Sequence, residues 1–235
     1  MAPVARELSS GWGVLEPFQT AASLEGQVKE LRHILRENGD LPITLIGWSW
    51  GAMLGFIFTA RYSLMVKKLI LVGSAVFEQK YAAEIMETRL SRLNEEEKTE
   101  VQKLVETLNN PAVENKNNLM SRLGKLFFKS DSYDPLPYKS EVLEYQYNIF
   151  RSVWEDAEEL RASGELLELG RSIHCPVVAV HGDYDPHSYQ GVQKPLSRVI
   201  KDFHFILLEN CGHYLWIERM ARDRFYDIIK EELKQ

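Results

Sequence analysis

The sequence predicts an α/β fold, in which a mostly parallel sheet is flanked by helices and interrupted by a helical insertion. Four short apolar runs, residues 43–48, 69–72, 177–180 and 203–208, predict strands of a sheet covered on both faces, where apolar and polar residues need not alternate. Segments with helical periodicity separate these runs. The long segment 77–170 breaks this alternation and shows helix signals only.

A fifth apolar run, residues 14–18, predicts a weaker strand, because Pro17 inside it has no N–H for a ladder hydrogen bond. Two helices are predicted from apolar residues that share one helical face. These are Leu24, Val28, Leu31 and Leu35 in the first helix, and Ala221, Phe225, Ile228 and Ile229 in the second.

The domain organisation follows from the same pattern. Residues 1–76 and 171–235 form the predicted α/β core, and residues 77–170 form a helical cap, or lid, inserted between two strands. Within the cap, Asn94 followed by three glutamates is typical of a helix start, since its side chain caps the first turn and the acidic residues suit the positive end of the helix. A chain of 235 residues with 45% hydrophobic content buries one substantial core.

Composition also limits which classes of partner and which cellular compartment the sequence favours. The net charge is −6, its acidic excess lies in residues 77–170, and no basic patch favours nucleic acid or an anionic membrane as a partner. No apolar run reaches the length of a membrane span, and the first residues lack the apolar region of a signal peptide. Cys175 and Cys211 have no metal-ligand spacing, and such sparse use of cysteine favours a cytoplasmic location.

A candidate nucleophile lies in the segment Gly47-Trp48-Ser49-Trp50-Gly51, between an apolar strand and an apolar helix. This is the strand, sharp turn and helix of a nucleophile elbow, in which the glycines permit a tight turn that lifts the serine hydroxyl into solvent. The helix N-terminus supplies positive potential, and the Trp50 backbone N–H is a candidate donor to an oxyanion.

An activated serine needs a histidine base and a carboxylate that orients the base. The turn 181–186, His-Gly-Asp-Tyr-Asp-Pro, follows one predicted strand, and Gly212-His213 follows the last one. The carboxyl ends of parallel strands meet at one edge of the sheet, where catalytic groups gather. Ser49, an aspartate of the turn (Asp183 or Asp185) and His213 are therefore the candidate triad, in the chain order Ser, Asp, His.

These segments, with Glu218 after the histidine, resemble the α/β-hydrolase superfamily, and residues 47–51 are similar to proline iminopeptidases. The resemblance implies that the second aspartate of the turn, Asp185, is the acid and that Asp183 is structural. It further implies a serine hydrolase that cleaves a small ester or amide through an acyl-serine intermediate, with no metal or organic cofactor. Lyase and cofactor-free peroxidase chemistry stay open, because one fold hosts several reactions.

Each site residue has a competing structural interpretation. Ser49 competes with an ordinary turn serine, His213 with a loop histidine bonded to backbone, and Asp185 with an Asx turn before Pro186. His181 is expected to support the turn. His187 either faces the site or lies at the surface, and the surface position is favoured. The aromatic residues of the insertion fit either the lining of an acyl pocket or a helical core; they are Tyr145, Tyr147, Phe150 and Trp154. Its carboxylates fit either a binding site for a substrate amine or a solvated helix face; they are Glu144, Glu155, Asp156, Glu158 and Glu159.

The chain also departs from the family pattern at its N-terminus. The resemblance implies earlier strands, and a His-Gly loop with the second oxyanion donor, before the helix represented by residues 2–8. Two explanations compete: a start codon upstream of Met1, which the intact triad favours, or a weakly active or inactive member that binds a ligand. A missing strand leaves a sheet edge that either pairs with residues 14–18 or is filled by another chain, which would make a homo-oligomer.

Overall fold

The computed structural model describes residues 1–137 and 145–234. Its sheet has four parallel strands in the order β1-β2-β3-β4. They are β1 (Ile43–Trp48), β2 (Val66–Val72), β3 (Val177–Gly182) and β4 (Phe203–Leu208). The four apolar runs predicted as strands are confirmed, and β2 begins three residues earlier than its apolar run.

Helices surround this sheet and fill the insertion. The α-helices are α1 (Ala2–Leu8), α2 (Leu24–Asn38), α3 (Trp50–Arg61), α4 (Gln79–Ala82), α5 (Ile85–Ser91), α6 (Glu95–Asn109), α7 (Asn117–Asp131), α8 (Tyr147–Ser163), α9 (Glu165–Glu168), α10 (Gln190–Val199) and α11 (Arg222–Lys234). The 3₁₀ helices are η1 (Ser63–Met65), η2 (Leu169–Ser172) and η3 (Leu215–Ile217). None of the helices in the described part of the chain is long and apolar enough to span a membrane.

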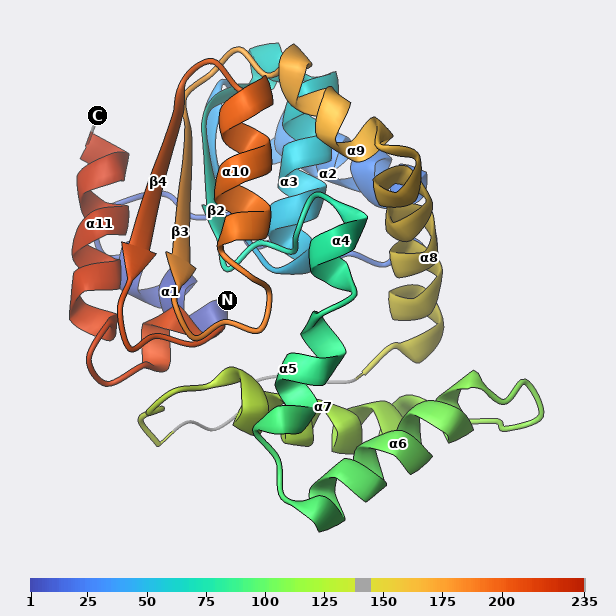
Figure 1. Cartoon of the computed structure of the whole chain (residues 1–235). Coiled ribbons are helices and arrows are strands. Elements are labelled where there is room, and N and C mark those ends of the chain that lie inside the picture. Colours follow the sequence, from blue (N-terminus) through green and yellow to red (C-terminus); the bar gives the residue numbers. More distant parts are fainter. Residues whose placement is uncertain (138–144, 235) are drawn as a thin grey trace.

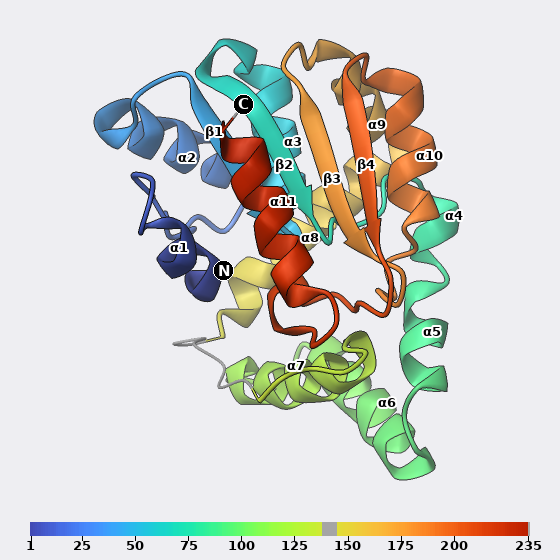
Figure 2. The same cartoon turned by 90° about the vertical axis from the view of Figure 1, so that its left-hand side faces the viewer.

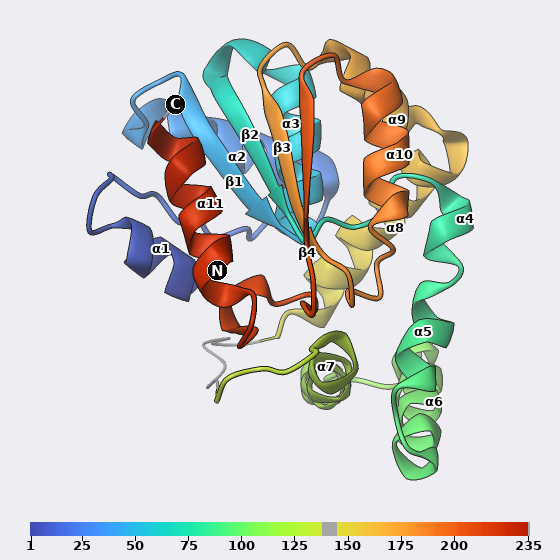
Figure 3. The same cartoon turned by 60° about the vertical axis from the view of Figure 1, so that its left-hand side comes forward.

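Both faces of the sheet are covered, which explains the unbroken apolar runs (Figures 1 and 3). Side chains of β2 alternate between two cores: Leu69 and Leu71 pack with α2, α3 and α10, whereas Ile70 and Val72 pack with α1 and α11. Figure 2 shows α11 lying across the face of the sheet opposite α3. Each large apolar side chain buried in this way contributes about 1.5–3 kcal/mol to stability.

The cap helices α5, α6 and α7 lie beyond the tips of the strand arrows, and so face the carboxyl ends of the strands (Figure 1). The predicted start of α6 is confirmed, since the Asn94 side chain accepts from the Glu97 N–H and Glu97 accepts from the Asn94 N–H. Its apolar stripe builds a separate core with α7. The following helix, α8, returns to the sheet and packs through Ala157 on the α3 side.

The expected strand at residues 14–18 is wrong, because this segment has no regular structure and makes no ladder. Phe18 is 76% exposed, and Pro17 cannot donate. The outer edge of β1 therefore pairs with no strand among residues 1–137 and 145–234. Direct pairing of this edge with residues 14–18, one of the two expected outcomes, does not occur.

Candidate active site

Ser49 occupies a strained turn between β1 and α3. Its φ of 52° and ψ of −117° lie outside the regions that a non-glycine residue ordinarily adopts. The turn is held from both sides, because the Ser49 N–H donates to the Val72 carbonyl at 3.1 Å and its own carbonyl accepts from the Ala52 N–H at 3.1 Å. Gly47 is required sterically, since a Cβ there would collide with the carbonyl of Gly51. This geometry is the one expected of the predicted nucleophile elbow.

Two groups at this turn are free for chemistry. The half-buried Ser49 side chain does not cap α3, and no hydrogen bond of its hydroxyl is found with the described residues. Trp50 is the first residue of α3, so its N–H has no partner within the helix. A hydroxyl and an amide that has no partner within its own helix thus meet at the positive end of a twelve-residue helix.

Asp185 and His213, from two different loops, form a buried pair. The Nδ1–H of His213 donates to Oδ2 of Asp185 at 2.6 Å, a short distance typical of a charge-assisted bond. A carboxylate only accepts, so in a neutral imidazole this contact fixes the proton on Nδ1 and leaves the lone pair on Nε2. Burial by itself would raise the pKa of Asp185, but the surrounding imidazoles, His213 foremost, hold that pKa well below its usual range.

Several contacts bring this pair beside the elbow. The Trp48 indole N–H donates to the His213 carbonyl at 2.9 Å, and the two rings are 5.0 Å apart. Gly73 directly follows Val72, whose carbonyl accepts from the Ser49 N–H, and it lies against both Asp185 and His213. A Cβ on Gly73 would lie 3.1 Å from the His213 carbonyl and 3.4 Å from Asp185 Oδ2. With a φ of +46°, this position favours glycine on backbone grounds as well.

The structure does not join Ser49 to His213 by a hydrogen bond. The carboxylate and the histidine are bonded to each other, and no hydrogen bond of the Ser49 hydroxyl is found with either of them or with any other described residue. Catalytic hydrogen bonds are often long before substrate binds, so this separation is compatible with a triad.

The two aspartates of the turn have different surroundings. Asp183 is exposed, and its Oδ1 accepts from the Cys211 N–H at 3.1 Å, a contact that ties two loops together. The Asp185 side chain is buried completely and faces imidazoles.

His187 lies in the site, which the sequence offered only as the less favoured of two interpretations, and its expected surface position is wrong. It is 7% exposed, and its Nδ1–H donates to Oδ1 of Asp185 at 2.8 Å. Its position two residues after Asp185 was the only available signal, and a polar loop with a proline gave no sign of burial. His181 supports the turn, as expected, by donating from Nε2 to the His187 carbonyl at 2.7 Å.

A second buried carboxylate ties the histidine loop to the cap. Glu218 is fully buried and accepts backbone N–H bonds from Gly212 at 3.1 Å, Tyr133 at 2.9 Å and Asp134 at 2.8 Å. Burial raises the pKa of Glu218, and these backbone donors oppose the rise. One carboxylate therefore joins the loop of the candidate base to the segment that leaves α7.

The end of α7 touches His213 directly. The Asp131 carbonyl accepts from the His213 N–H at 2.7 Å. The Asp131 carboxylate, almost fully buried, receives a two-pronged bond from Arg89 of α5, with the closest contact at 2.7 Å. This ion pair locks α5 to the end of α7, where α7 contacts the candidate base.

The insertion's aromatic residues divide between two environments. Tyr147 is buried in the cap core and donates to the Leu108 carbonyl, whereas Trp154 lies 5.3 Å from the ring of Trp50. Phe150 is 44% exposed, and Tyr145 lies beside Gly124. Of the acidic residues, Asp156 caps the start of α2 and Glu155 pairs with Arg151, while Glu144 lies outside the described residues.

Three side chains of the site lie close enough to be considered as metal ligands: Asp185, His187 and His213 each offer an atom within 4.8 Å of the others. These contacts are hydrogen bonds from two N–H donors to the two oxygens of one carboxylate. Each imidazole N–H already has a carboxylate oxygen of Asp185 as its acceptor, as in a hydrogen-bonded cluster.

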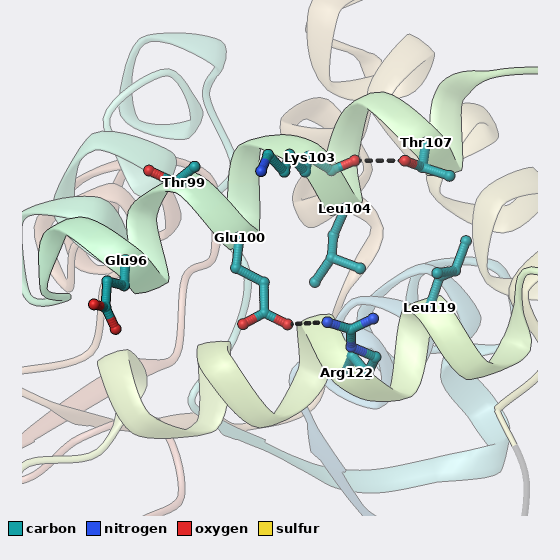
Figure 4. A pocket seen from close by; sticks show the side chains of 8 residues that line it. All are labelled: Glu96, Thr99, Glu100, Lys103, Leu104, Thr107, Leu119 and Arg122. Carbon is teal, nitrogen blue, oxygen red and sulfur yellow. Dashed lines mark hydrogen bonds and ion pairs between the residues drawn. The ribbon is translucent and has the colours of Figure 1, made fainter.

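An open groove between α6 and α7 is a separate feature (Figure 4). Glu100 and Arg122 pair across it at 2.5 Å, and the Thr107 hydroxyl donates to the Lys103 carbonyl on its rim. None of its lining residues belongs to the elbow or to the Asp185–His213 pair.

Comparison with protein families gives one match: the model of the α/β-hydrolase fold matches residues 17–219. No curated protein matches the chain. An α/β-fold family hydrolase from Bacillus anthracis is similar in structure, with a TM-score of 0.65 at 15% identity over 89% of this chain and 73% of that one.

Two further solved structures have named activities. A proline iminopeptidase from Mycobacterium smegmatis matches with a TM-score of 0.58 at 16% identity, over 92% of this chain and 74% of that one. An esterase from Exiguobacterium antarcticum matches with a TM-score of 0.56 at 17% identity, over 96% and 79% of the two chains. At these identities the likeness is one of fold.

Proposed function

The chain belongs to the α/β-hydrolase fold family, whose members are typically hydrolytic enzymes, and we propose that it is a serine hydrolase that cleaves a small ester or amide through an acyl-Ser49 intermediate. The observation that carries the proposal is the 2.6 Å bond between Asp185 and His213 beside a serine in an elbow conformation.

In the proposed mechanism, His213 Nε2 takes the hydroxyl proton as Ser49 Oγ attacks the substrate carbonyl. Asp185 holds the His213 ring in the required tautomer and stabilises the imidazolium that forms. The Trp50 N–H donates to the oxyanion. His213 then gives its proton to the leaving alcohol or amine, and a water molecule, activated by the same base, hydrolyses the acyl-enzyme. The chemistry needs no metal or organic cofactor.

The proposed substrate is small and either neutral or cationic. The cap that covers the carboxyl ends of the strands carries the chain's acidic excess, which disfavours the approach of strongly anionic substrates. The names of the esterase and the proline iminopeptidase described above are compatible with this class of ester or amide substrate.

A fluorophosphonate probe tests the proposal, because only an activated serine reacts with it readily. We expect the wild type to be labelled and Ser49→Ala to lose the label. Ser10→Ala, at an exposed serine, is the matched control and keeps it. Labelling that persists in Ser49→Ala would show that the nucleophile is misassigned.

A specific observation favours a second candidate function, that of a ligand-binding protein on the same fold. The Ser49 hydroxyl makes no hydrogen bond to the described residues, and a second oxyanion donor beside Trp50 N–H is not identified among them. The loss of one such donor lowers the rate by about 10²–10³-fold. A folded wild type that the probe leaves unlabelled would support this alternative.

Two coarser features complete the proposal. In the described part of the chain, no strand pairs with the outer edge of β1, so a second copy of the chain can add a strand there. We therefore propose a homo-oligomer, and light scattering tests this proposal by measuring the molar mass. The cytoplasmic location stays a prediction from the two cysteines, both of which are free and buried.

A further inference from the structure

The Asp185 carboxylate is held by two histidines, one on each oxygen. Oδ2 accepts from His213 Nδ1 at 2.6 Å, and Oδ1 accepts from His187 Nδ1 at 2.8 Å and from the His187 backbone N–H at 2.9 Å. The proposed mechanism uses only the first of these contacts. The two remaining bonds hold the same carboxylate from its other side.

His187 is itself fixed in place. Its side chain is 9% exposed, its ring lies 4.8 Å from the His213 ring, and its carbonyl accepts from His181 Nε2 at 2.7 Å. The same His181 nitrogen is 3.4 Å from Asp185 Oδ2. Three imidazoles thus surround one buried carboxylate, and the carbonyl of His213 also accepts a hydrogen bond from Trp48, at the end of the strand that leads to Ser49.

His187 offers the carboxylate a neutral donor. Burial lowers the pKa of His187 to about 4, although the Asp185 carboxylate pulls in the opposite direction, while His213 and Arg89 reinforce the lowering. Near neutral pH the ring is therefore uncharged and carries one proton, on the nitrogen that faces Asp185. It orients the carboxylate without competing with the imidazolium that forms on His213.

We propose that His187 is a positioning residue of the hydrolytic site: its Nδ1–H fixes Oδ1 of Asp185, so that Oδ2 stays aimed at His213. The proposal rests on the proposed function, in which His213 is the base. Without the imidazole donor, Oδ1 keeps only the His187 backbone N–H, so the carboxylate is held less firmly about its Cβ–Cγ bond and the base loses part of the fixed orientation of its partner. Partners of this kind, which orient the residues that do the chemistry, typically change activity by about 10–100-fold when they are removed.

If the role of His187 were purely structural, activity would depend on whether the replacement side chain fills the space of the imidazole, and less on whether it donates a hydrogen bond. Three variants separate the two roles. His187→Asn keeps an N–H donor near the place of Nδ1, His187→Gln moves the same amide outward by one methylene, and His187→Leu fills the space without a donor. Thermal unfolding of each variant confirms that the protein compared is folded.

The first measurement is turnover of a p-nitrophenyl ester. We expect His187→Leu and His187→Gln to lower kcat by about 10–100-fold with KM changed by less than about threefold, and His187→Asn to stay within about threefold of the wild type. Equal losses in the Asn and Leu variants, or a change confined to KM, would overturn the proposal.

The second measurement needs no turnover, so it separates failure of this inference from failure of the proposed function. The downfield ¹H NMR resonance of the His213 Nδ1–H reports its bond to Asp185 directly. We expect it to be sharp in the wild type and in His187→Asn, and broadened or lost in His187→Leu. An inactive wild type with this pattern would contradict hydrolysis and leave the positioning intact, whereas an unchanged resonance in His187→Leu would refute the positioning.

Discussion

Two aspartates only two residues apart occupy opposite environments, and the difference is one of partners. Asp183 is exposed and accepts one backbone bond, which the carbonyl oxygen of an asparagine can also accept. Asp185 is buried and accepts only from N–H donors, three of them within 2.9 Å. An amide NH₂ placed there would face these donors and would favour the wrong tautomer of His213.

Asp185→Asn should therefore lower kcat by about 10³–10⁴-fold for ester hydrolysis, because the base then lacks both its orientation and its counter-charge. Asp183→Asn is the matched control, and we expect its kcat to stay within about threefold of the wild type. The measurement is steady-state turnover of folded variants. A larger loss in Asp183→Asn would mean that the acid of the site is the other aspartate.

The loop after β4 and the segment after α7 behave as one element, although they are about 80 residues apart in sequence. Pro135 and Glu218 form an antiparallel bridge, and the Leu136 N–H donates to the Ile217 carbonyl at 2.7 Å. The Glu218 carboxylate completes the junction with its three backbone donors. The cap is therefore attached to the core at the loop that carries His213.

Glu218→Gln tests this junction. The side-chain NH₂ of glutamine would point at backbone N–H donors, so at least one buried donor would lose its partner. We expect the free energy of unfolding to fall by about 2–3 kcal/mol. Glu209→Gln, at an exposed glutamate near the end of β4, should change it by less than about 0.5 kcal/mol. The measurement is urea unfolding at neutral pH, and coincident curves for the two variants would contradict the role assigned to Glu218.

The candidate site lies at the carboxyl ends of the strands of a sheet that is covered on both faces. The burial of imidazoles at this site has a consequence for global stability. Burial lowers the pKa of His181 and lowers that of His187 to about 4. In the unfolded chain these histidines titrate near pH 6.5. Between these values the unfolded state binds more protons than the folded state, so stability rises with pH in this window.

We therefore expect the free energy of unfolding to fall as the pH is lowered from about 6.5 to 4, by up to about 3 kcal/mol from His187 alone. Glu218, whose pKa is raised, acts in the opposite sense. Comparison of variants isolates the histidine: His187→Asn should flatten the decline, and His33→Asn, at an exposed position on α2, should not. Urea unfolding at several pH values gives the slopes, and equal slopes for wild type and His187→Asn would exclude the effect.

The sequence by itself determined the local features of this protein. Apolar runs predicted all four strands, because strands covered on both faces are apolar throughout, and Asn94 predicted the start of α6, because a helix cap is a contact between near neighbours. It also placed Asp185 and His213 after neighbouring strands, whose carboxyl ends share one edge of the sheet.

The tertiary structure alone decided the features that depend on residues distant in sequence. A strand exists only where another strand pairs with it, so the apolar pattern of residues 14–18 could not determine that segment. The burial of His187, the contacts of Gly73 and the three bonds of Glu218 arise from loops and helices that meet only in the fold. The physical reason is that hydrogen-bond partners and burial belong to pairs of segments, whereas periodicity and capping belong to one.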